Sequence, residues 1–416
     1  MKPGVVIIGA GHSGSQAAVS LRQEGYAGAI ALIGAEPGYP YHRPPLSKAF
    51  LKQDDDKLQP LRGEAVYEAS GIDYHRARRV HRIDLSTRRC VLDGGDIAFD
   101  ELIIATGAAS RMPAVEGISL DGIFALRTAS DARRIRQHMK DVESVVIVGG
   151  GFIGLETAAT MAAFGKRVTV LEIGERLLAR AVSPVVATHV LSRLSDCGVD
   201  VRFGTQVRAF FGDDAVRGVF TGEDETTAAD MVIVGIGADP DVDLAVEAGL
   251  EVDGGIVVDD MLRSSAQGVY AIGDCARFPH WQLGQPVRLE SVQNATDQAR
   301  HVAGVLMGKP NPYVTVPWFW SDIGNMKLQM AGLSANADRQ IVTGDPTGGA
   351  FAVYHFKHAR LVGVDTINRP GDHMLGRKMI AANYQPEEAD ILAGRVNDAF
   401  KAWSSQTTSD GERHLA

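Results

Sequence analysis

Cysteine is scarce in this chain of 416 residues, which contains three cysteines. Cys90, Cys197 and Cys275 lie far apart and form no CxxC or CxxxxC pair. We therefore expect neither a dithiol redox centre nor a cysteine zinc site. The histidines show no metal-ligand spacing either, so we expect no bound metal.

Long apolar runs and an excess of positive charge are also lacking. No apolar run reaches the roughly 20 residues of a membrane span, so we expect no membrane partner. The first predicted strand begins at about residue 4, which leaves no room for a cleaved signal and favours a cytoplasmic protein. The formal net charge of −9 argues against nucleic acid as a partner. Nothing in the sequence marks an exposed apolar interface, so we expect a monomer or a weak dimer.

The chain opens with a buried strand and a glycine-rich turn. Residues 5–8 are all β-branched, which is typical of a parallel strand, and GxGxxG follows at Gly9, Gly11 and Gly14. In this pattern the first glycine allows a tight turn and the second lets the backbone approach a pyrophosphate. The third lets the next helix pack closely on the strand.

The elements after this turn complete the pattern of a dinucleotide site. We predict a helix over 13–25 and a second strand over 30–33, and Glu36 follows that strand. The helix would present its N-terminus to the phosphates, and Glu36 would accept hydrogen bonds from the ribose hydroxyls. A glycine-rich turn without a ligand is the alternative for a lone GxGxxG, but this context favours a bound dinucleotide.

The same pattern returns near the middle of the chain. A predicted strand over 145–148 precedes GxGxxG at Gly149, Gly151 and Gly154, and another strand follows over 168–172. Because both units are complete, the sequence predicts two bound dinucleotides.

The acid at the end of this later strand predicts which nicotinamide coenzyme binds. A carboxylate at Glu172 would accept the ribose hydroxyls of NAD and repel the 2′-phosphate of NADP. Ile173 and Gly174 follow it, whereas Arg176 and Arg180 lie near enough to weaken this repulsion. We therefore expect NADH.

Further strands and a change of pattern define the expected architecture. Asp274 ends a predicted strand over 269–274 and should face the first dinucleotide. From residue 317 the sequence contains strand-like runs followed by helical segments, which is typical of an α+β domain. We predict an α/β fold with two Rossmann-like dinucleotide-binding domains, the NADH domain inserted in the domain of the first dinucleotide, and a C-terminal α+β domain. The predicted boundaries are 1–110 and 238–315 for the first domain, 111–237 for the inserted domain, 316–403 for the C-terminal domain and 404–416 for a disordered tail.

Several motifs resemble a known family of flavoproteins. This chain resembles the two-dinucleotide flavoprotein reductases in three framework motifs, which are ATG at 105–107, LRT at 126–128 and YAIGD at 270–274. Within that superfamily, the chain resembles the ferredoxin reductases that serve bacterial haem-thiolate monooxygenases. Four motifs carry this resemblance: RPPLSK (43–48), GGGFIGLE (149–156), ESVQNATDQAR (290–300) and PWFWSD (317–322). The resemblance covers nearly the whole chain.

The resemblance implies the cofactors, the partner and the reaction. It implies FAD at the first site, NADH at the second, and a C-terminal domain that helps to dock a 2Fe–2S ferredoxin. NADH would pass a hydride to flavin N5, and the reduced flavin would pass single electrons to the ferredoxin, which feeds an oxygenase. The particular ferredoxin, the oxygenase and its substrate stay open.

The resemblance also implies the residues that contact each cofactor. The FAD contacts would be Gly9, Gly11, Ser13, Gly14, Glu36, Arg43, Lys48, Val80, Ala105, Thr106, Gly107, Arg127, Asp274 and Val292. The NADH contacts would be Gly149, Gly151, Phe152, Ile153, Gly154, Glu156, Glu172, Arg180 and Gly237.

Two of these residues are candidates for catalysis. Lys48 follows the first dinucleotide-binding half, and Glu156 lies just inside the helix after the second glycine loop. Our hypothesis is that they form an ion pair beside flavin N5, where a desolvated lysine would stabilise negative charge on reduced flavin. For Glu156, a role as helix-dipole partner is the alternative.

Two departures from related families bear on the function. The disulfide reductases of this superfamily carry a cysteine pair near 41–48, which this chain lacks. Reductases of ring-hydroxylating dioxygenases can carry a tryptophan where Val292 stands, so the monooxygenase branch is favoured. The alternatives are a dioxygenase reductase, an NADH-dependent flavin oxidase or reductase with a small acceptor such as oxygen or a quinone, and an NADH sensor without turnover.

The C-terminal domain carries aromatic and basic residues that could meet a partner. Trp318 and Trp320 alternate with Phe319, so on a strand the two tryptophans share one face. We expect core packing between domains for them, with contact to the flavin-side partner surface as the alternative. The candidates for docking an acidic ferredoxin are Lys327, Arg369, Arg377 and Lys378.

Overall fold

A computed structural model describes residues 4–222 and 225–413, with side chains as far as residue 406. Contacts between residues divide the chain into two compact units. The first unit contains the described residues up to Arg111 together with Leu126–Arg136 and Gly237–Thr315. The second contains Met112–Ala125, Gln137–Ile236 and the described residues from Val316 onward. The three-domain division with the boundaries given above stays a prediction.

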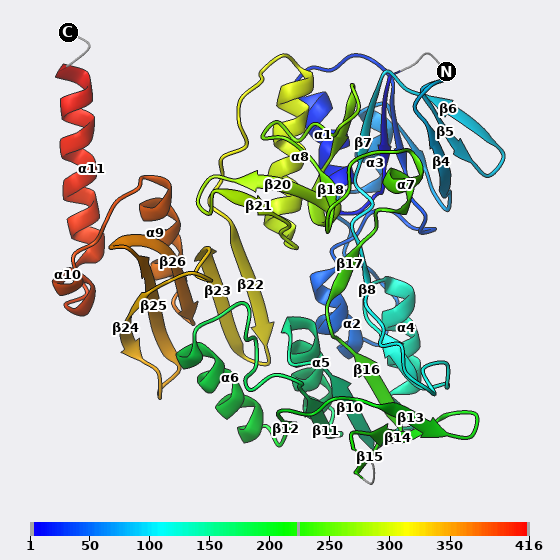
Figure 1. The fold of residues 1–416 in the computed structure, drawn as a ribbon, viewed down its shortest axis with the longest axis vertical. Coiled ribbons are helices and arrows are strands. Elements are labelled where there is room, and N and C mark those ends of the chain that lie inside the picture. Colours follow the sequence, from blue (N-terminus) through cyan, green and yellow to red (C-terminus); the bar gives the residue numbers. More distant parts are fainter. Residues whose placement is uncertain (1–3, 223–224, 414–416) are drawn as a thin grey trace. The chain divides into compact units, whose positions relative to one another are not determined.

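The first unit is built on a parallel sheet in the order β19–β7–β1–β2–β3. The central strand β1 (Val5–Ile8) pairs with β2 and β7, and all four of its residues are buried. Its β-branched residues suit this position because a central parallel strand is covered on both faces. Helix α1 packs along α8 in the same unit (Figure 1).

The first unit contains these elements: β1, α1 (His12–Gln23), β2 (Ile30–Ile33), η1 (Pro44–Ser47), α2 (Ala49–Lys52), α3 (Glu64–Ala69), β3 (Ile72–His75), β4 (Val80–Asp84), β5 (Arg89–Leu92), β6 (Gly95–Ala98), β7 (Glu101–Ile104), β8 (Ala108–Ser110), β17 (Ala238–Pro240), α7 (Asp243–Glu247), β18 (Ile256–Val257), β19 (Val269–Ala271), η2 (Gly273–Cys275), β20 (Ala276–His280), β21 (Gln285–Val287) and α8 (Val292–Leu306). Most of α4 (Ala129–His138) also belongs to it.

The second unit holds a parallel sheet and an antiparallel sheet. The parallel sheet has the order β12–β11–β10–β16–β9, and the antiparallel sheet has the order β22–β23–β26–β25–β24. Helix α5 packs on β10 and β11 of the first of these sheets and also on β22 of the second. Helix α9 packs on β23 and β26 (Figure 1). The second glycine loop, between β10 and α5, therefore lies close to the C-terminal sheet.

The second unit contains these elements: β9 (Ile123–Ala125), β10 (Ser144–Val148), α5 (Phe152–Ala163), β11 (Arg167–Leu171), α6 (Pro184–Asp196), β12 (Asp200–Arg202), β13 (Ala209–Gly212), β14 (Val216–Phe220), β15 (Thr226–Ala228), β16 (Met231–Val234), β22 (Trp318–Ile323), β23 (Met326–Gly332), β24 (Arg339–Asp345), β25 (Ala350–Lys357), β26 (Arg360–Ile367), α9 (Pro370–Ala381), α10 (Glu388–Leu392) and α11 (Val396–Arg413).

The end of the chain differs from the prediction. Residues 404–413 continue helix α11 instead of forming a disordered tail, and 414–416 lie outside the described residues. The rings of Phe400 and Trp403 pack on Tyr384, with centroids 5.2 and 5.1 Å away. These contacts hold the first turns of α11 on the C-terminal domain, and the polar residues that follow continue the helix from that anchored start.

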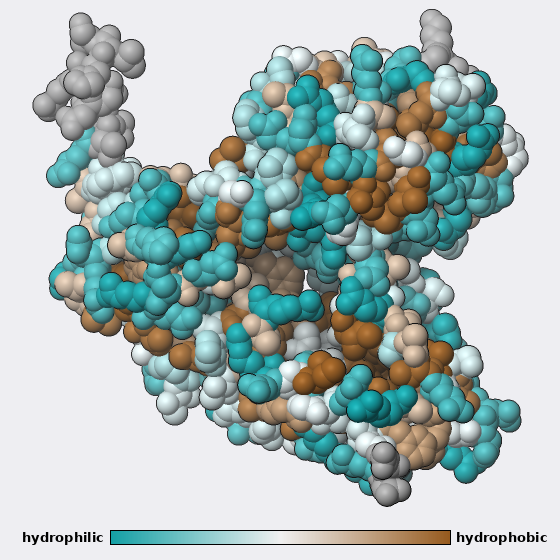
Figure 2. All heavy atoms as spheres, viewed as in Figure 1, coloured by the Kyte–Doolittle hydropathy of each residue, from teal (hydrophilic) through white to brown (hydrophobic). Residues whose placement is uncertain are grey.

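The visible surface of each unit mixes hydrophilic residues with smaller apolar groups (Figure 2). Ile173, Val246, Val314, Met374 and Leu392 are among the exposed large hydrophobic residues. Single exposed apolar residues of this kind are normal on a folded protein. Within the described ranges, no helix is long and apolar enough to cross a membrane.

Candidate dinucleotide sites

Packing at the end of β1 explains the glycines of the first loop. Gly9 has a φ of +105°, and a Cβ there would collide with the carbonyl oxygen of Ala105. A Cβ on Gly14 would collide with the carbonyl oxygen of Gly9, whereas a Cβ on Gly11 would meet nothing within 4 Å. The first and third glycines are therefore required by the fold, and the second borders open space through which a ligand can approach the backbone.

The N-terminus of α1 is suited to an anion. Gly11 caps the helix without a side-chain hydrogen bond, and the first turn contains no acidic residue. Burial, with smaller effects from His42, Arg43 and Arg127, lowers the pKa of His12 to about 3. In the part of the chain that the structure describes, the buried Nε2 atom of His12 has no hydrogen-bond partner. Open backbone, positive surroundings and an unpaired polar atom together fit a bound pyrophosphate.

The carboxylate after β2 is held by side chains. Glu36 accepts hydrogen bonds from Arg43 through Oε1 at 2.7 Å and from the Tyr41 hydroxyl through Oε2 at 2.6 Å. Arg43 also donates to the carbonyl oxygen of Arg127 at 2.7 Å, and the Tyr41 hydroxyl accepts from the Ala129 backbone N–H at 2.8 Å. Burial raises the pKa of Tyr41 to about 12, so its hydroxyl keeps its proton and donates it to Glu36. This network fixes the Glu36 carboxylate, and its contact with a ribose stays a prediction.

The carboxyl end of β19 meets the start of α1. A Cβ on Gly273 would lie 2.7 Å from the Ser13 hydroxyl, and the Gly273 N–H donates to Gln298 at 2.7 Å. Asp274 accepts a hydrogen bond from Arg127 at 2.9 Å. The structure therefore brings Ser13, Arg127 and Asp274 together beside the first glycine loop, at the carboxyl edge of a parallel sheet where ligands usually bind.

The other residues predicted to contact FAD also lie in the first unit. Lys48 is half-buried directly after η1, Val80 is buried at the start of β4, and Val292 is the first residue of α8. Ala105, Thr106 and Gly107 directly follow β7. Contact of each of these residues with FAD stays a prediction.

The second glycine loop repeats the packing of the first. Gly149 has a φ of +106°, and its missing Cβ would meet the carbonyl oxygen of Gly235. A Cβ on Gly154 would collide with the carbonyl oxygen of Gly149, whereas one on Gly151 would lie 3.7 Å from its nearest neighbour. Gly151 also caps α5 without a side-chain hydrogen bond. The loop can therefore bind a second pyrophosphate in the same way.

The first residues of α5 are accessible. Phe152 is half-buried, and Ile153 is 43% exposed. Both were predicted to contact NADH, and their exposure fits a site that a coenzyme enters and leaves.

Backbone groups hold the carboxylate of the second unit. Glu172 accepts the Gly150 N–H through Oε2 and the Gly174 N–H through Oε1, both at 2.6 Å. These two hydrogen bonds fix both oxygens of the carboxylate in place. Its negative charge therefore stands next to the glycine loop.

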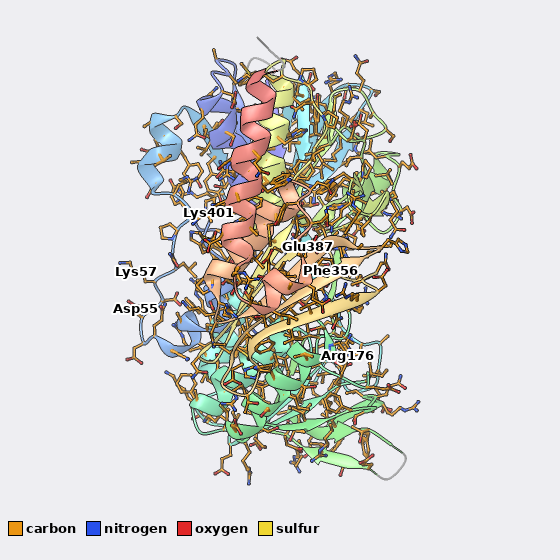
Figure 3. The ribbon with its side chains drawn as sticks, turned by 90° about the vertical axis from the view of Figure 1, so that its left-hand side faces the viewer. Asp55, Lys57, Arg176, Phe356, Glu387 and Lys401 are labelled. Atoms are coloured by element: carbon orange, nitrogen blue, oxygen red, sulfur yellow. The ribbon has the colours of Figure 1, made fainter. Side chains whose placement is uncertain are left out.

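The two arginines near this acid differ. Arg176, which Figure 3 labels on the segment between β11 and α6, donates to the carbonyl oxygens of Val182 at 2.7 Å and Ala179 at 2.5 Å. Arg180, the one predicted to contact NADH, is exposed. Hydrogen bonds within its own loop therefore hold the Arg176 side chain.

Some predicted contacts belong to different units. Lys48 lies in the first unit and Glu156 in the second, so their ion pair stays a prediction. Gly237, with a φ of +117°, begins the last segment of the first unit, whereas the other predicted NADH contacts lie in the second.

Ser321 is a residue that the sequence analysis missed. Glu156 is 4% exposed, and Ser321 on β22 donates a hydrogen bond to its Oε1 atom at 2.7 Å. The PWFWSD motif includes this serine, but nothing in the motif itself marks the serine as functional. No local pattern links positions 156 and 321, so only the fold could show this pair.

The tryptophans of the C-terminal domain share a face, as predicted. The rings of Trp318 and Trp320 lie 5.5 Å apart, and Arg377 covers the Trp318 ring at 4.6 Å. His373 of α9 also contacts Trp318, at 5.6 Å. Trp318 therefore packs within its own domain.

Two of the four proposed docking cations are freely exposed on the surface and two are engaged. Lys327 and Lys378 are exposed, whereas Arg369 forms an ion pair with Asp372 at 2.5 Å and Arg377 packs on Trp318. Docking by any of the four stays a prediction.

Comparison with known families covers most of the chain. The family described as pyridine nucleotide-disulphide oxidoreductase matches residues 3–299, and the domain described as reductase C-terminal matches residues 318–397.

Named relatives match over nearly their full lengths. Rhodocoxin reductase of Rhodococcus erythropolis is 44% identical over 390 residues, which are 92% of this chain and 91% of the relative. Putidaredoxin reductase CamA of Pseudomonas putida is 38% identical over 397 residues, covering 93% of this chain and 94% of the relative.

Solved structures match equally well. The ferredoxin reductase for the CYP199A2 system from Rhodopseudomonas palustris has a TM-score of 0.91 and 41% identity, covering 94% of this chain and 97% of that one. Putidaredoxin reductase in its covalent complex with putidaredoxin has a TM-score of 0.89 and 36% identity, covering 95% of this chain and 99% of that one.

The fold and the two loops define a flavin-dependent oxidoreductase with an α/β fold and a C-terminal α+β domain, which confirms the predicted fold class. The chain belongs to the pyridine nucleotide-disulphide oxidoreductase family, in the branch that includes the ferredoxin reductases. It is an enzyme, and its cofactors are FAD and NAD(H).

Proposed function

We propose that this protein is an NADH-dependent ferredoxin reductase that passes electrons to a 2Fe–2S ferredoxin serving a monooxygenase, of the haem-thiolate type. The names of its relatives support electron transfer from a nicotinamide coenzyme to an iron–sulfur protein. When bound, FAD supplies the conversion of a two-electron hydride donor into a source of single electrons. The first glycine loop and the Glu36 network would hold FAD, and the second loop and Glu172 would hold NADH.

The observation that carries this proposal is the combination of two dinucleotide sites with no dithiol beside them. Disulfide reductases of this family need a cysteine pair, whereas residues 41–48 contain none. Cys90 and Cys275 are buried, and burial raises the pKa of the Cys90 thiol to about 12. Cys197 is exposed but belongs to the second unit. Electrons must therefore leave for an external acceptor.

The surroundings of Glu172 support NADH as the donor. Both carboxylate oxygens are fixed by backbone N–H groups, so the acid cannot turn away from a 2′-phosphate. Arg176, the nearest cation along the chain, is held by two carbonyl oxygens. A 2′-phosphate would therefore meet a fixed negative charge, whereas ribose hydroxyls would find acceptors.

Lys48 and Glu156 would act together where the nicotinamide meets the flavin. The half-buried ammonium of Lys48 would stabilise negative charge at flavin N5, and the buried carboxylate of Glu156 would orient that ammonium. Val292, at the start of α8, supports the monooxygenase branch because dioxygenase reductases can carry tryptophan there.

The test is NADH oxidation by the purified yellow protein, with a 2Fe–2S ferredoxin or with air alone. We expect fast reduction of the ferredoxin and slow consumption of oxygen. Rapid oxygen consumption with no gain from ferredoxin would overturn the proposal in favour of a small-acceptor oxidase. No turnover with either acceptor would overturn it in favour of an NADH sensor.

A further inference from the structure

The first turns of α5 are packed against strand β22 of the C-terminal domain. The rings of Phe152 and Phe319 lie 4.6 Å apart, and a Cβ on Gly324, in the turn after β22, would lie 3.9 Å from the Ala159 side chain. Both elements belong to the second unit (Figure 1). The helix that follows the second glycine loop therefore rests on a strand more than 150 residues away in sequence.

Strand alternation places a hydroxyl on this contact. Residues 319, 321 and 323 of β22 share one face, and residues 318 and 320 share the other. Phe319 packs on α5, so Ser321 faces the same helix, whereas Trp318 packs on His373 of α9. Ser321 is 1% exposed and donates its hydroxyl hydrogen to Glu156.

The carboxylate that receives this hydrogen bond is itself removed from water. Glu156 is 4% exposed, and the distance between Ser321 Oγ and Glu156 Oε1 is 2.7 Å. A buried carboxylate stays ionised only when donors or positive charges replace its lost hydration. A hydrogen bond to a charged acceptor is stronger than one between neutral groups, and it also fixes the rotamer of the acceptor. Ser321 therefore fixes the direction of the Glu156 side chain and replaces part of its lost hydration.

We propose that Ser321 is a positioning residue for Glu156, through which the C-terminal domain sets the rate of reduction by NADH. The inference rests on the proposed function, in which Glu156 works with Lys48 beside the flavin. Ser321 touches neither coenzyme in this account and acts through the carboxylate alone. The C-terminal domain would then serve the NADH half of the reaction as well as ferredoxin docking.

The experiment compares variants of the FAD-loaded enzyme. Ser321→Ala removes the donor, and Ser321→Thr keeps it. Thr366→Val is the matched control, because Thr366 is fully buried in the same sheet and its hydroxyl donates to a backbone carbonyl, that of Gln329, at 3.3 Å. Glu156→Gln, alone and combined with Ser321→Ala, shows whether the serine acts through the acid.

The main measurement is the rate of flavin reduction by NADH without oxygen. We expect Ser321→Ala to slow reduction by about tenfold near neutral pH. Ser321→Thr should restore the wild-type rate within about twofold, and Thr366→Val should match the wild type. Ser321→Ala should add nothing to the loss that Glu156→Gln causes.

A second measurement does not depend on turnover. A double-mutant cycle of Ser321→Ala and Glu156→Gln on thermal unfolding should show coupling between the two positions, whereas Thr366→Val and Glu156→Gln should be additive. Should the alanine variant fail to fold, Ser321→Cys provides a weaker donor of similar shape for the same comparisons.

The two proposals fail in different ways. If Glu156→Gln slows reduction but Ser321→Ala leaves the rate unchanged, the role of Ser321 is overturned and the proposed role of Glu156 stands. If Glu156→Gln itself has no effect, the proposed role of the acid is overturned, and the positioning role with it. Equal losses in the alanine and threonine variants would also overturn the inference, because they would show a purely structural role.

Discussion

The two glycine loops have nearly the same backbone in different surroundings. Gly9 and Gly149 have φ values of +105° and +106°, and each loop ends on a glycine N-cap without a side-chain hydrogen bond. At the second position after the N-cap, however, Ser13 is 6% exposed, whereas Ile153 in the second loop is 43% exposed. The first loop is closed in by its own unit, and the second is open.

The carboxylates of the two sites also differ in the groups that hold them. Side chains hold Glu36, through Arg43 and Tyr41, whereas backbone N–H groups of its own loop hold Glu172. A network of side chains from several segments suits a cofactor that stays bound, because every segment must move to release it. A compact, open loop suits a coenzyme that exchanges at each turnover. The same motif can therefore serve a resident and a visiting dinucleotide.

We expect the largest effects from changing the third glycine of each loop. These variants test whether the first loop holds FAD and the second holds NADH. In Gly14→Val and Gly154→Val, the new side chain collides with the carbonyl oxygen of the first glycine of the loop. We expect Gly14→Val to yield protein without FAD. Gly154→Val should stay yellow and lose at least about a hundredfold in its rate of reduction by NADH. Flavin absorbance and anaerobic rapid mixing measure both effects, and a yellow Gly14→Val protein would contradict the assignment of the sites.

Lys48→Ala tests whether a residue of the first unit speeds the reduction of the flavin by NADH. We expect the rate of flavin reduction by NADH to fall about a hundredfold, because a preorganised charge is lost from the reacting centre. FAD content should change little. Lys52→Ala, an exposed lysine at the end of α2, is the control and should behave as the wild type. An unchanged rate in Lys48→Ala would rule out its proposed role.

Glu172→Gln tests whether Glu172, unlike Glu36, sets the preference for NADH over NADPH. The ratio of kcat/KM for NADH to that for NADPH should fall about tenfold, because the repulsion of the 2′-phosphate is lost. Glu36→Gln is the matched variant in the first unit and should lower FAD retention without changing this ratio. Steady-state kinetics with both coenzymes measure the effect, and a constant ratio in Glu172→Gln would show that other groups select the coenzyme.

The last expected effect concerns stability at acid pH, because only the first loop carries a titratable residue directly after its N-cap. The pKa of His12 is about 3 in the folded protein against an ordinary 6.5, so below pH 6.5 the unfolded chain binds a proton that the folded one does not. The free energy of unfolding should therefore fall as the pH drops from 6.5 toward 3, by about 2 kcal/mol at pH 5 from this residue.

The variant His12→Gln should lose less stability between pH 7 and pH 5 than the wild type does. Urea unfolding at the two pH values measures this difference. His81→Gln is the control, because His81 is exposed and paired with Asp93, and it should keep the acid sensitivity of the wild type. Equal acid sensitivity in His12→Gln and the wild type would show that His12 is not the group responsible.

Local patterns predicted the elements of both sites well. The predicted strand over 30–33 is β2, and the predicted helix over 13–25 is α1, which spans His12–Gln23. These elements are decided by neighbours within a few residues, since the turn needs glycine and the strand needs apolar β-branched residues. The tail after residue 404 was predicted wrongly because its helix begins on the contacts of Phe400 and Trp403 with Tyr384, which a polar sequence does not reveal.

The sequence by itself determined two dinucleotide loops, an acid after each second strand and the absence of a dithiol, because each depends on residue types at short, regular spacings. Only the tertiary structure decided which groups hold those acids and that Ser321 bonds Glu156. Such pairs join segments far apart in the chain, and their distances follow from the packing of whole elements. That packing depends on many weak contacts summed over each element, so no short pattern of residues encodes it.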